Sequence, residues 1–186
     1  MKDLSKLPGN LPVPIDDGAC THLPGTRIPS VPLVATSGET VNLGTLPGTV
    51  VAYIYPMIGR PDSPPLLGWN DIPGARGCTP QSCAFRDHYT ELNSLGSKVF
   101  GVSAQPLEDQ KEAKARLGLP FELLNDSRFA LAEAMRLPTF EYAKSLLLKR
   151  LTIVAKNGII QKVFYPVFPP DRNAEDVIEW LKNENA

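Results

Sequence analysis

The chain has 186 residues, and its 19 basic and 20 acidic side chains leave a net charge of −1 at pH 7. This length fits a substantial hydrophobic core, so we expect residues 1–186 to form a single domain. The balanced charge and the lack of any run of about 18 apolar residues argue against nucleic-acid and membrane partners. The N-terminus has no apolar signal-peptide core and the three cysteines form no disulfide scaffold, so we expect a cytoplasmic protein with reduced thiols.

The N-terminal third begins with a segment, residues 1–30, that is rich in proline and glycine. Such a segment cannot form a helix, and we expect it to wrap the surface as an N-terminal extension. Residues 31–36 and 40–43 flank Ser37-Gly38-Glu39, which predicts a short hairpin. Residues 49–55 are β-branched or aromatic on both faces and predict a buried central strand.

A long connection follows this strand. Residues 57–77 are rich in glycine and proline, and an irregular loop of this length inside a domain is often functional. After it, apolar residues at helical spacing predict a helix over residues 79–95. Pro80 fits its first turn, where the missing N–H costs nothing.

The remaining elements alternate between strands and helices. We expect a strand over residues 98–104, a helix over 107–117, a strand over 121–124, a helix over 129–135, strands over 147–155 and 159–164, and a helix over 173–183. The last two strands flank Asn157-Gly158, which predicts a tight hairpin. This order indicates an α/β fold with a mixed sheet flanked by helices.

Two cysteines lie at the predicted start of the helix that follows the long loop. Cys78 stands in the positive field of the unpaired backbone N–H groups at the helix N-terminus. That field favours the thiolate and makes Cys78 a candidate nucleophile. Cys83, five positions further on, is a second thiol that can trap the oxidised form of the first. The pair therefore indicates redox chemistry.

Residues 77–87 read Gly-Cys-Thr-Pro-Gln-Ser-Cys-Ala-Phe-Arg-Asp, and this segment resembles the peroxiredoxins. The resemblance is strongest to the branch of bacterioferritin comigratory proteins, or peroxiredoxin Q. It is carried by Gly77, Cys78, Thr79, Gln81, Cys83, Phe85, Arg86 and Asp87, and it extends from about Val31 to the C-terminus. It implies a thioredoxin-like fold with the inserted loop placed before the active-site helix.

The resemblance also implies an activity, that of a thiol-dependent peroxidase without a cofactor. Cys78 would reduce hydrogen peroxide or an organic hydroperoxide and become a sulfenic acid. Cys83 would resolve this acid as an intramolecular disulfide, and a thioredoxin-like or glutaredoxin-like partner would reduce the disulfide. Arg150 would support the thiolate. The residues expected around the bound peroxide are Pro56, Gly77 and Thr79.

The resolving step makes a geometric demand on the helix. Residues five apart in an intact helix are separated by roughly 8 Å at Cα and point about 140° apart. A disulfide needs Cα atoms within about 7 Å of each other. We therefore expect the reduced and oxidised forms to differ locally between Gly77 and Phe85.

The sequence departs from the family pattern Pro-x-x-x-Thr-x-x-Cys. Pro56 can occupy the proline position, but the long loop intervenes, and Ala75 stands where threonine or serine is usual. The missing hydroxyl would have to be replaced by Ser63, by Arg76 or by a backbone donor. The apolar loop residues could form a lid or a wall for a bulkier hydroperoxide; they are Leu66, Leu67, Trp69 and Ile72.

Other functions remain open at this stage. A thiol–disulfide oxidoreductase acting on proteins normally uses Cys-x-x-Cys, and the wider spacing here argues against it. A non-enzymatic redox sensor or binding module is kept open by Ala75 and the long loop. No Gly-x-Gly-x-x-Gly follows a strand, so we expect no nicotinamide or flavin. Monomer and homodimer both fit the sequence.

A zinc site is the remaining alternative for the thiols. Its ligands would be drawn from Cys20, His22, Cys78, Cys83 and His88. These residues are far apart in the sequence and belong to different elements, whereas structural zinc sites use paired short spacings. We therefore expect no metal. Cys20 is expected to be a free or partly buried thiol in the N-terminal segment, or a second resolving cysteine.

Overall fold

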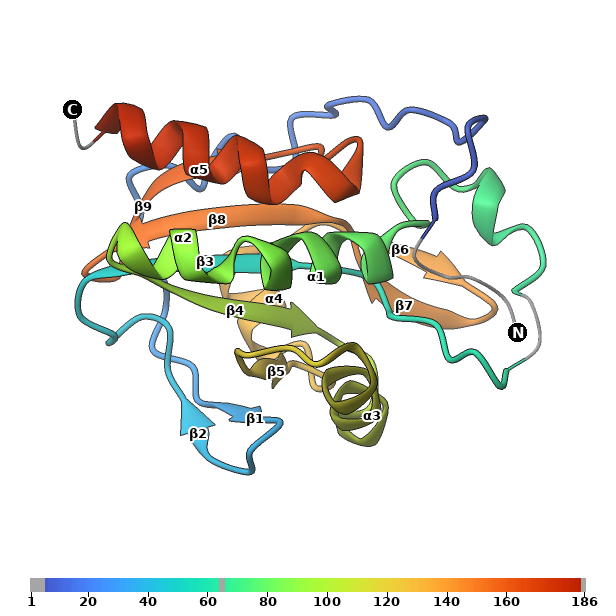
Figure 1. The fold of residues 1–186 in the computed structure, drawn as a ribbon, viewed down its shortest axis with the longest axis horizontal. Coiled ribbons are helices and arrows are strands. Elements are labelled where there is room, and N and C mark those ends of the chain that lie inside the picture. The colour runs from blue at the N-terminus through green and yellow to red at the C-terminus, as the bar shows by residue number, and fades with distance from the viewer. Residues whose placement is uncertain (1–5, 64–65, 185–186) are drawn as a thin grey trace.

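The computed structural model describes residues 6–63 and 66–184. Its centre is a seven-stranded mixed sheet with the strand order β2-β1-β5-β4-β3-β8-β9 (Figure 1). Strand β3 (Thr49–Ile54) lies in the middle, parallel to β4 (Ser97–Ser103) and antiparallel to β8 (Leu151–Lys156). Five of its six residues are buried, which confirms the central strand expected from its apolar sequence.

Short strands and hairpins complete the two edges of the sheet. Strand β5 (Leu123–Asn125) continues the parallel part beside β4, and β1 (Leu33–Ala35) joins β5 and forms a hairpin with β2 (Thr40–Val41). At the other edge, β8 forms a hairpin with β9 (Ile159–Phe164). Asn157 and Gly158 both have positive φ in its turn, as the sequence predicts.

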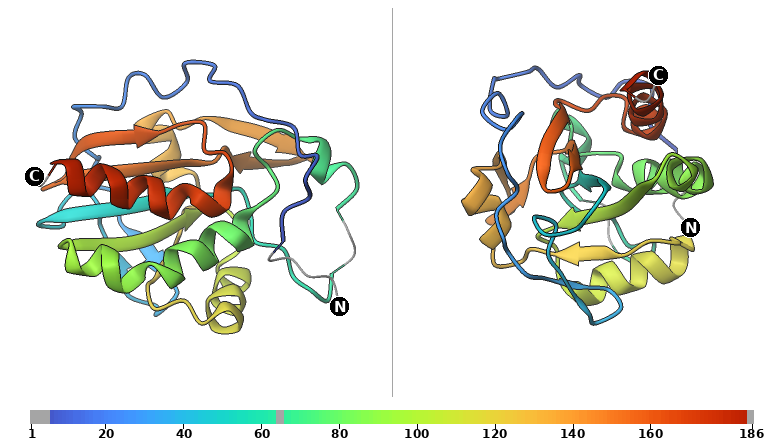
Figure 2. Two further views of the ribbon diagram at one scale, coloured as in Figure 1. Left: turned by 45° about the horizontal axis from the view of Figure 1, so that its top comes forward. Right: turned by 90° about the vertical axis from the view of Figure 1, so that its left-hand side faces the viewer.

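Helices cover both faces of the sheet because side chains of β3 alternate between them. Val51, Tyr53 and Tyr55 pack on one side against α1 (Cys78–Asp87), α2 (Tyr89–Ser94), α3 (Leu107–Leu117) and α5 (Asn173–Glu184). On the other side, Val50, Ala52 and Ile54 pack against α4 (Ala130–Met135) and the N-terminal segment. Figure 2 shows these layers from two further directions, and α1 and α5 run side by side in both.

The N-terminal segment, residues 6–30, contains no helix and crosses the molecule from the long loop to the β9 edge (Figure 1). It buries Cys20, Leu23 and Ile28 in the core. Three backbone hydrogen bonds of 2.8–2.9 Å tie residues 25–28 to the β9 end of the last hairpin. An ion pair between Asp17 and Lys149, 2.7 Å long, holds the middle of the N-terminal segment in place.

Two sequence-based boundaries are wrong. The helix expected over residues 79–95 begins at Cys78 and breaks at His88, whose ψ of 7° is not helical, so that α1 and α2 are separate. The strand expected over residues 147–155 is also two strands. Its beginning belongs to β7 (Ser145–Leu148), which pairs with β6 (Thr139–Tyr142) in a hairpin apart from the main sheet.

Among the described residues, no helix has the length and apolar character needed to cross a bilayer.

Candidate active site

Cys78 is the first residue of α1, and the backbone that places it there requires glycine before it. Gly77 has a φ of 116° at the N-cap position. A Cβ atom on Gly77 would lie 2.2 Å from Cγ of Pro170, so an L side chain meets both strain and a clash. Cys78 itself is only 3% exposed. The helix start therefore holds the sulfur in a fixed, mostly buried position.

Arg150 is the cation beside this sulfur. Its Nη2 lies 3.2 Å from the Sγ of Cys78 and 3.0 Å from the carbonyl oxygen of Ala75. Its Nε donates to the carbonyl oxygen of Gly74 at 3.2 Å. Arg150 is 3% exposed, and none of its hydrogen-bond partners in the described structure is a carboxylate. Cys78 is therefore the neighbouring group that is able to carry a negative charge beside this buried cation.

A buried polar network continues from Arg150 into the core. The Oε1 of Gln81 accepts a hydrogen bond from Nη1 of Arg150, and its Nε2 donates to Oδ1 of Asn173 at 2.9 Å. The same oxygen accepts from the hydroxyl of Thr152 at 2.6 Å. Asn173 and Thr152 carry no local sequence signal for this role, because Gln81 and Asn173 lie 92 positions apart.

Cys83 lies on the same intact helix and is half-buried. Burial raises the pKa of its thiol above the ordinary value. It does not line the cavity over Cys78. All three cysteines are free thiols. Cys78 and Cys83 are therefore not joined by a disulfide, in agreement with the distance between them in an intact helix.

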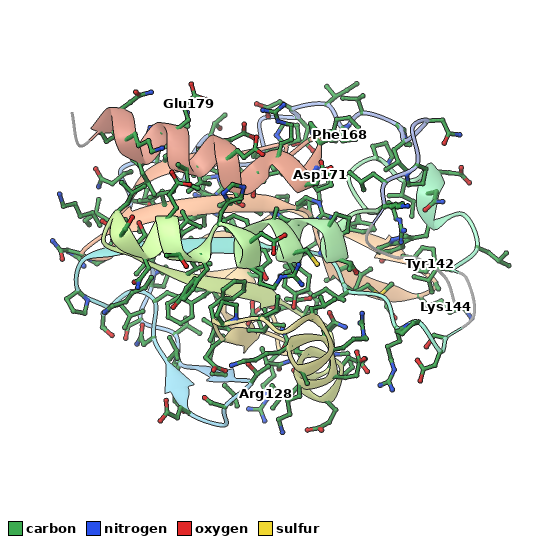
Figure 3. The ribbon with its side chains drawn as sticks, in the orientation of Figure 1. Arg128, Tyr142, Lys144, Phe168, Asp171 and Glu179 are labelled. Atoms are coloured by element: carbon green, nitrogen blue, oxygen red, sulfur yellow. The ribbon has the colours of Figure 1, made fainter. Side chains whose placement is uncertain are left out.

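A cavity of about 1080 Å³ opens over Cys78, Gly77 and Thr79. Much of its wall comes from the long loop and the β6–β7 hairpin, and this part includes Met57, Ile58, Trp69, Tyr142, Leu146 and Leu147. Tyr142, labelled in Figure 3, joins the two segments by donating its hydroxyl to the carbonyl of Leu67 at 2.9 Å. Pro56 does not line the cavity; it is buried, and its carbonyl accepts from the hydroxyl of Ser103.

Ala75 stands at the position where a hydroxyl side chain is usual, and its methyl group makes apolar contacts instead. It packs in an apolar cluster with Trp69 and Leu147, while its carbonyl accepts from Arg150 and lies 3.7 Å from the Sγ of Cys78. Ser63 and Arg76, the two side chains that could replace the missing hydroxyl, both line the cavity.

Cys20 lies apart from this site. It is buried in the core cluster on the opposite face of the sheet from Cys78, and burial raises its pKa to about 12. The ring of His22 is hydrogen-bonded to the carbonyl of Met135 at 2.9 Å. Within residues 6–63 and 66–184, no three His, Cys, Asp or Glu side chains gather in a group that could hold a metal ion.

A family model described as Redoxin matches residues 23–178, a range that includes Cys78, Cys83 and Arg150. The chain belongs to the Redoxin family. Peroxiredoxin Q, chloroplastic, from Oryza sativa subsp. japonica is 29% identical over 86% of this chain and 66% of its own length, so the chain spans just under two thirds of that relative. Peroxiredoxin Q, chloroplastic, from Sedum lineare is 29% identical over 86% of this chain and 77% of its own. These relatives support the resemblance to the peroxiredoxin Q branch.

Solved structures share the thioredoxin-like fold of this Redoxin family member. Peroxidoxin BcpB from Mycobacterium tuberculosis superposes with a TM-score of 0.71 at 22% identity, over 87% of this chain and 98% of its own. PrxQ from Xylella fastidiosa superposes with a TM-score of 0.72 at 20% identity, over 89% and 99%. The bacterioferritin comigratory protein of Xanthomonas campestris, studied for its alkyl peroxide reduction activity, gives 0.69 at 22% identity, over 89% and 98%.

Proposed function

We propose that the chain is a thiol-dependent peroxidase of the atypical two-cysteine type. The observation that carries this proposal is the contact between the buried Arg150 and the Sγ of Cys78, at a helix N-terminus that opens into a cavity. Membership of the Redoxin family and the peroxiredoxin Q relatives support it. A preorganised cation beside a thiol favours the thiolate and stabilises charge that develops on the departing oxygen.

The reaction runs in two steps on this chain. The Cys78 thiolate attacks one oxygen of the hydroperoxide, the O–O bond breaks, and the other oxygen leaves as an alcohol or water after taking up a proton. Cys78 is then a sulfenic acid. The Cys83 sulfur attacks the sulfur of Cys78, water leaves, and an intramolecular disulfide forms. A thioredoxin-like or glutaredoxin-like dithiol then restores both thiols by exchange.

The contacts of α1 suggest how far the helix unwinds for the second step. Its first half is held by hydrogen bonds of buried polar groups, among them Gln81 and Ser82, whose Oγ lies 3.1 Å from the hydroxyl of Tyr53. Its second half is held by Phe85, which stacks on Tyr53 with ring centroids 4.6 Å apart. When the helix opens, hydrogen bonds to water can replace those of the polar groups. Water cannot replace the apolar contacts of the buried aromatic ring. We place the limit of unwinding between Ser82 and Phe85.

The cavity favours an organic hydroperoxide over hydrogen peroxide. A volume of about 1080 Å³ far exceeds what hydrogen peroxide needs, and such cavities hold drug-sized molecules. The apolar wall formed by Trp69, Leu146 and Leu147 would cover the organic part of the substrate. Alkyl peroxide reduction by the similar Xanthomonas campestris protein supports this preference. Three free thiols fit a reducing compartment such as the cytoplasm.

A redox sensor on the same fold is the second candidate, because Ala75 removes one active-site donor and packs into an apolar cluster. A sensor would react with peroxide through the same thiols but slowly. The speed of the first step therefore separates the two functions. Oxidoreduction of protein disulfides is less well supported, since Cys78 is almost inaccessible to a bulky partner in the wound helix.

The test is stopped-flow tryptophan fluorescence of the reduced protein mixed with hydrogen peroxide or cumene hydroperoxide. Trp69 in the cavity wall and Trp180 on α5 are the reporters. We expect fast oxidation, faster with cumene hydroperoxide, that is lost in Cys78→Ser. Intact mass should show the loss of two hydrogens, which Cys83→Ser abolishes. Oxidation no faster than that of a free thiol, or unaffected by Cys78→Ser, would overturn the peroxidase proposal in favour of a sensor.

A further inference from the structure

We propose that Asn173 is a positioning residue that holds Arg150 against Cys78, acting through Gln81, and that it releases Arg150 when α1 unwinds. The inference rests on the proposed peroxidase function and adds a residue to its machinery. Asn173 begins α5 and follows the short helix η2 (Pro170–Arg172), whose Pro170 packs against Gly77. The start of α5 therefore lies next to the start of α1, as Figure 1 shows.

The hydrogen bonds run in one consistent direction. Thr152 donates to Oδ1 of Asn173, which turns that oxygen toward the network, and the same oxygen accepts from Nε2 of Gln81. This sets the amide of Gln81, so its oxygen faces the Nη1 of Arg150. A flipped Gln81 amide would put a nitrogen donor against the Arg150 donors and lose both bonds. The orientation of Asn173 thus decides whether Arg150 has an acceptor on α1.

The chemistry of residue 173 also fits this role. The Nδ2 of Asn173 is buried and has no partner in the described structure, which costs stability. An aspartate there would accept both hydrogen bonds and leave no unpaired donor. It would also place a carboxylate two hydrogen bonds from Arg150 and compete with the Cys78 thiolate for the positive charge. The neutral amide holds the network without drawing on that charge.

Disulfide formation must break this network. Cys83 reaches Cys78 only if the first turns of α1 unwind, and Gln81 lies between the two cysteines. When it leaves, Arg150 loses its Gln81 acceptor and Asn173 loses its Gln81 donor. The network therefore stabilises the wound helix relative to the unwound helix. Cys78 reacts with peroxide in the wound form and forms the disulfide with Cys83 in the unwound form. Weakening it should affect the two steps in opposite directions.

The experiment compares Asn173→Ala with Asn183→Ala, a matched change at an exposed position of the same helix. In the stopped-flow assay, Asn173→Ala should slow the second-order reaction with cumene hydroperoxide and accelerate disulfide formation, each by about fivefold, the equivalent of one lost hydrogen bond. Asn183→Ala should change neither. Two rates that fall together, or that both stay unchanged, would overturn the proposal.

A second variant and a peroxide-free readout keep the test independent of the proposed function and of folding defects. Asn173→Asp keeps both hydrogen bonds, so disulfide formation should keep its wild-type rate, while alkylation of Cys78 by iodoacetamide should shift to higher pH. No shift in that profile for Asn173→Asp would also contradict the proposal. The other charged or titratable groups that line the cavity or interact with Cys78 are the same in these variants; they are Lys6, Tyr53, Tyr55, Arg60, Arg76, Asp109 and Tyr142.

Discussion

Arg150 is a buried cation whose hydrogen-bond partners other than Cys78 are neutral. These acceptors are carbonyl oxygens of the loop before α1 and the side-chain oxygen of Gln81. Burying a charge is costly unless it is hydrogen-bonded and balanced. The loop carbonyls supply the hydrogen bonds, and Cys78 can supply the balancing charge only as a thiolate. The reactivity of Cys78 therefore depends on the burial of Arg150.

Replacing this cation should remove most of the peroxide reactivity. We expect Arg150→Gln to lower the second-order rate constant with cumene hydroperoxide by about 10²-fold, the scale seen for loss of one active-site donor. Lys149→Gln is the matched control, because it removes a positive charge from the adjacent residue, whose partner is Asp17 on the surface. Stopped-flow fluorescence measures both. Equal losses in the two variants would show that overall charge, rather than the contact with Cys78, matters.

The sequence predicts the reacting cysteines and Arg150, but not the polar side chains that hold Arg150 in place. Cys78 and Cys83 stand in one short motif, and Arg150 could be found from its resemblance to the family. Asn173 and Thr152 could not, because a neutral buried amide and hydroxyl have no recognisable spacing and meet Gln81 only through the packing of α5 and β8 against α1. Ala75 was identified as a departure, yet its packing against Trp69 depends on a loop whose path the sequence does not specify.

At the scale of elements, the start of α1 depends on close contact with the residues before α5. Gly77→Ala adds a methyl group in a region that favours glycine and against Cγ of Pro170. We expect a loss of about 2 kcal/mol or more in the free energy of unfolding, measured by urea denaturation. Peroxide reactivity should also fall, because Pro170 must move and Asn173 follows it in the chain.

Gly9→Ala is the control for this change. No atom lies within 4 Å of the position that its Cβ would take. Its stability and rate should match the wild type. If Gly77→Ala were as stable as Gly9→Ala, the helix start would not be held against Pro170 as the structure has it.

The β6–β7 hairpin is the element that sequence reasoning missed. Its turn residues, Ala143 and Lys144, both have positive φ, a conformation normally signalled by glycine or asparagine. Without that signal, the apolar residues of β7 run into those of β8 as one predicted strand. The β8–β9 hairpin was found because its turn is Asn157-Gly158. The difference matters for function, since the missed hairpin forms part of the cavity wall.

At the scale of the whole molecule, the N-terminal segment connects the cavity to the far edge of the sheet. Leu7 lines the cavity, and Asp17 binds Lys149 beside Arg150. Hydrogen bonds from Lys149 and Tyr165 lower the pKa of Asp17 to about 2. Because the pKa is depressed on folding, the stabilising contribution is present above the ordinary carboxylate range and is lost as pH falls toward 2. The segment is therefore held in place at any physiological pH.

Removing this carboxylate charge should loosen the segment and expose the thiol that it buries. We expect Asp17→Asn to increase the rate at which iodoacetamide alkylates Cys20 at least severalfold, measured by peptide mass spectrometry. Asp16→Asn is the control, since Asp16 bonds only to the nearby backbone of Gly18 among the contacts described. An unchanged Cys20 rate in Asp17→Asn would show that the backbone bonds to the hairpin suffice to hold the segment.

The backbone hydrogen bonds between residues 25–28 and the β8–β9 hairpin also cover an edge of the sheet. Strand β9 is the last strand of the sheet, and an outer strand with unpaired N–H and C=O groups is a template for pairing with another chain. Residues 25–28 occupy part of that edge. The N-terminal segment thereby covers part of the edge to which another chain could pair, so its removal should lower the solubility of the protein at high concentration.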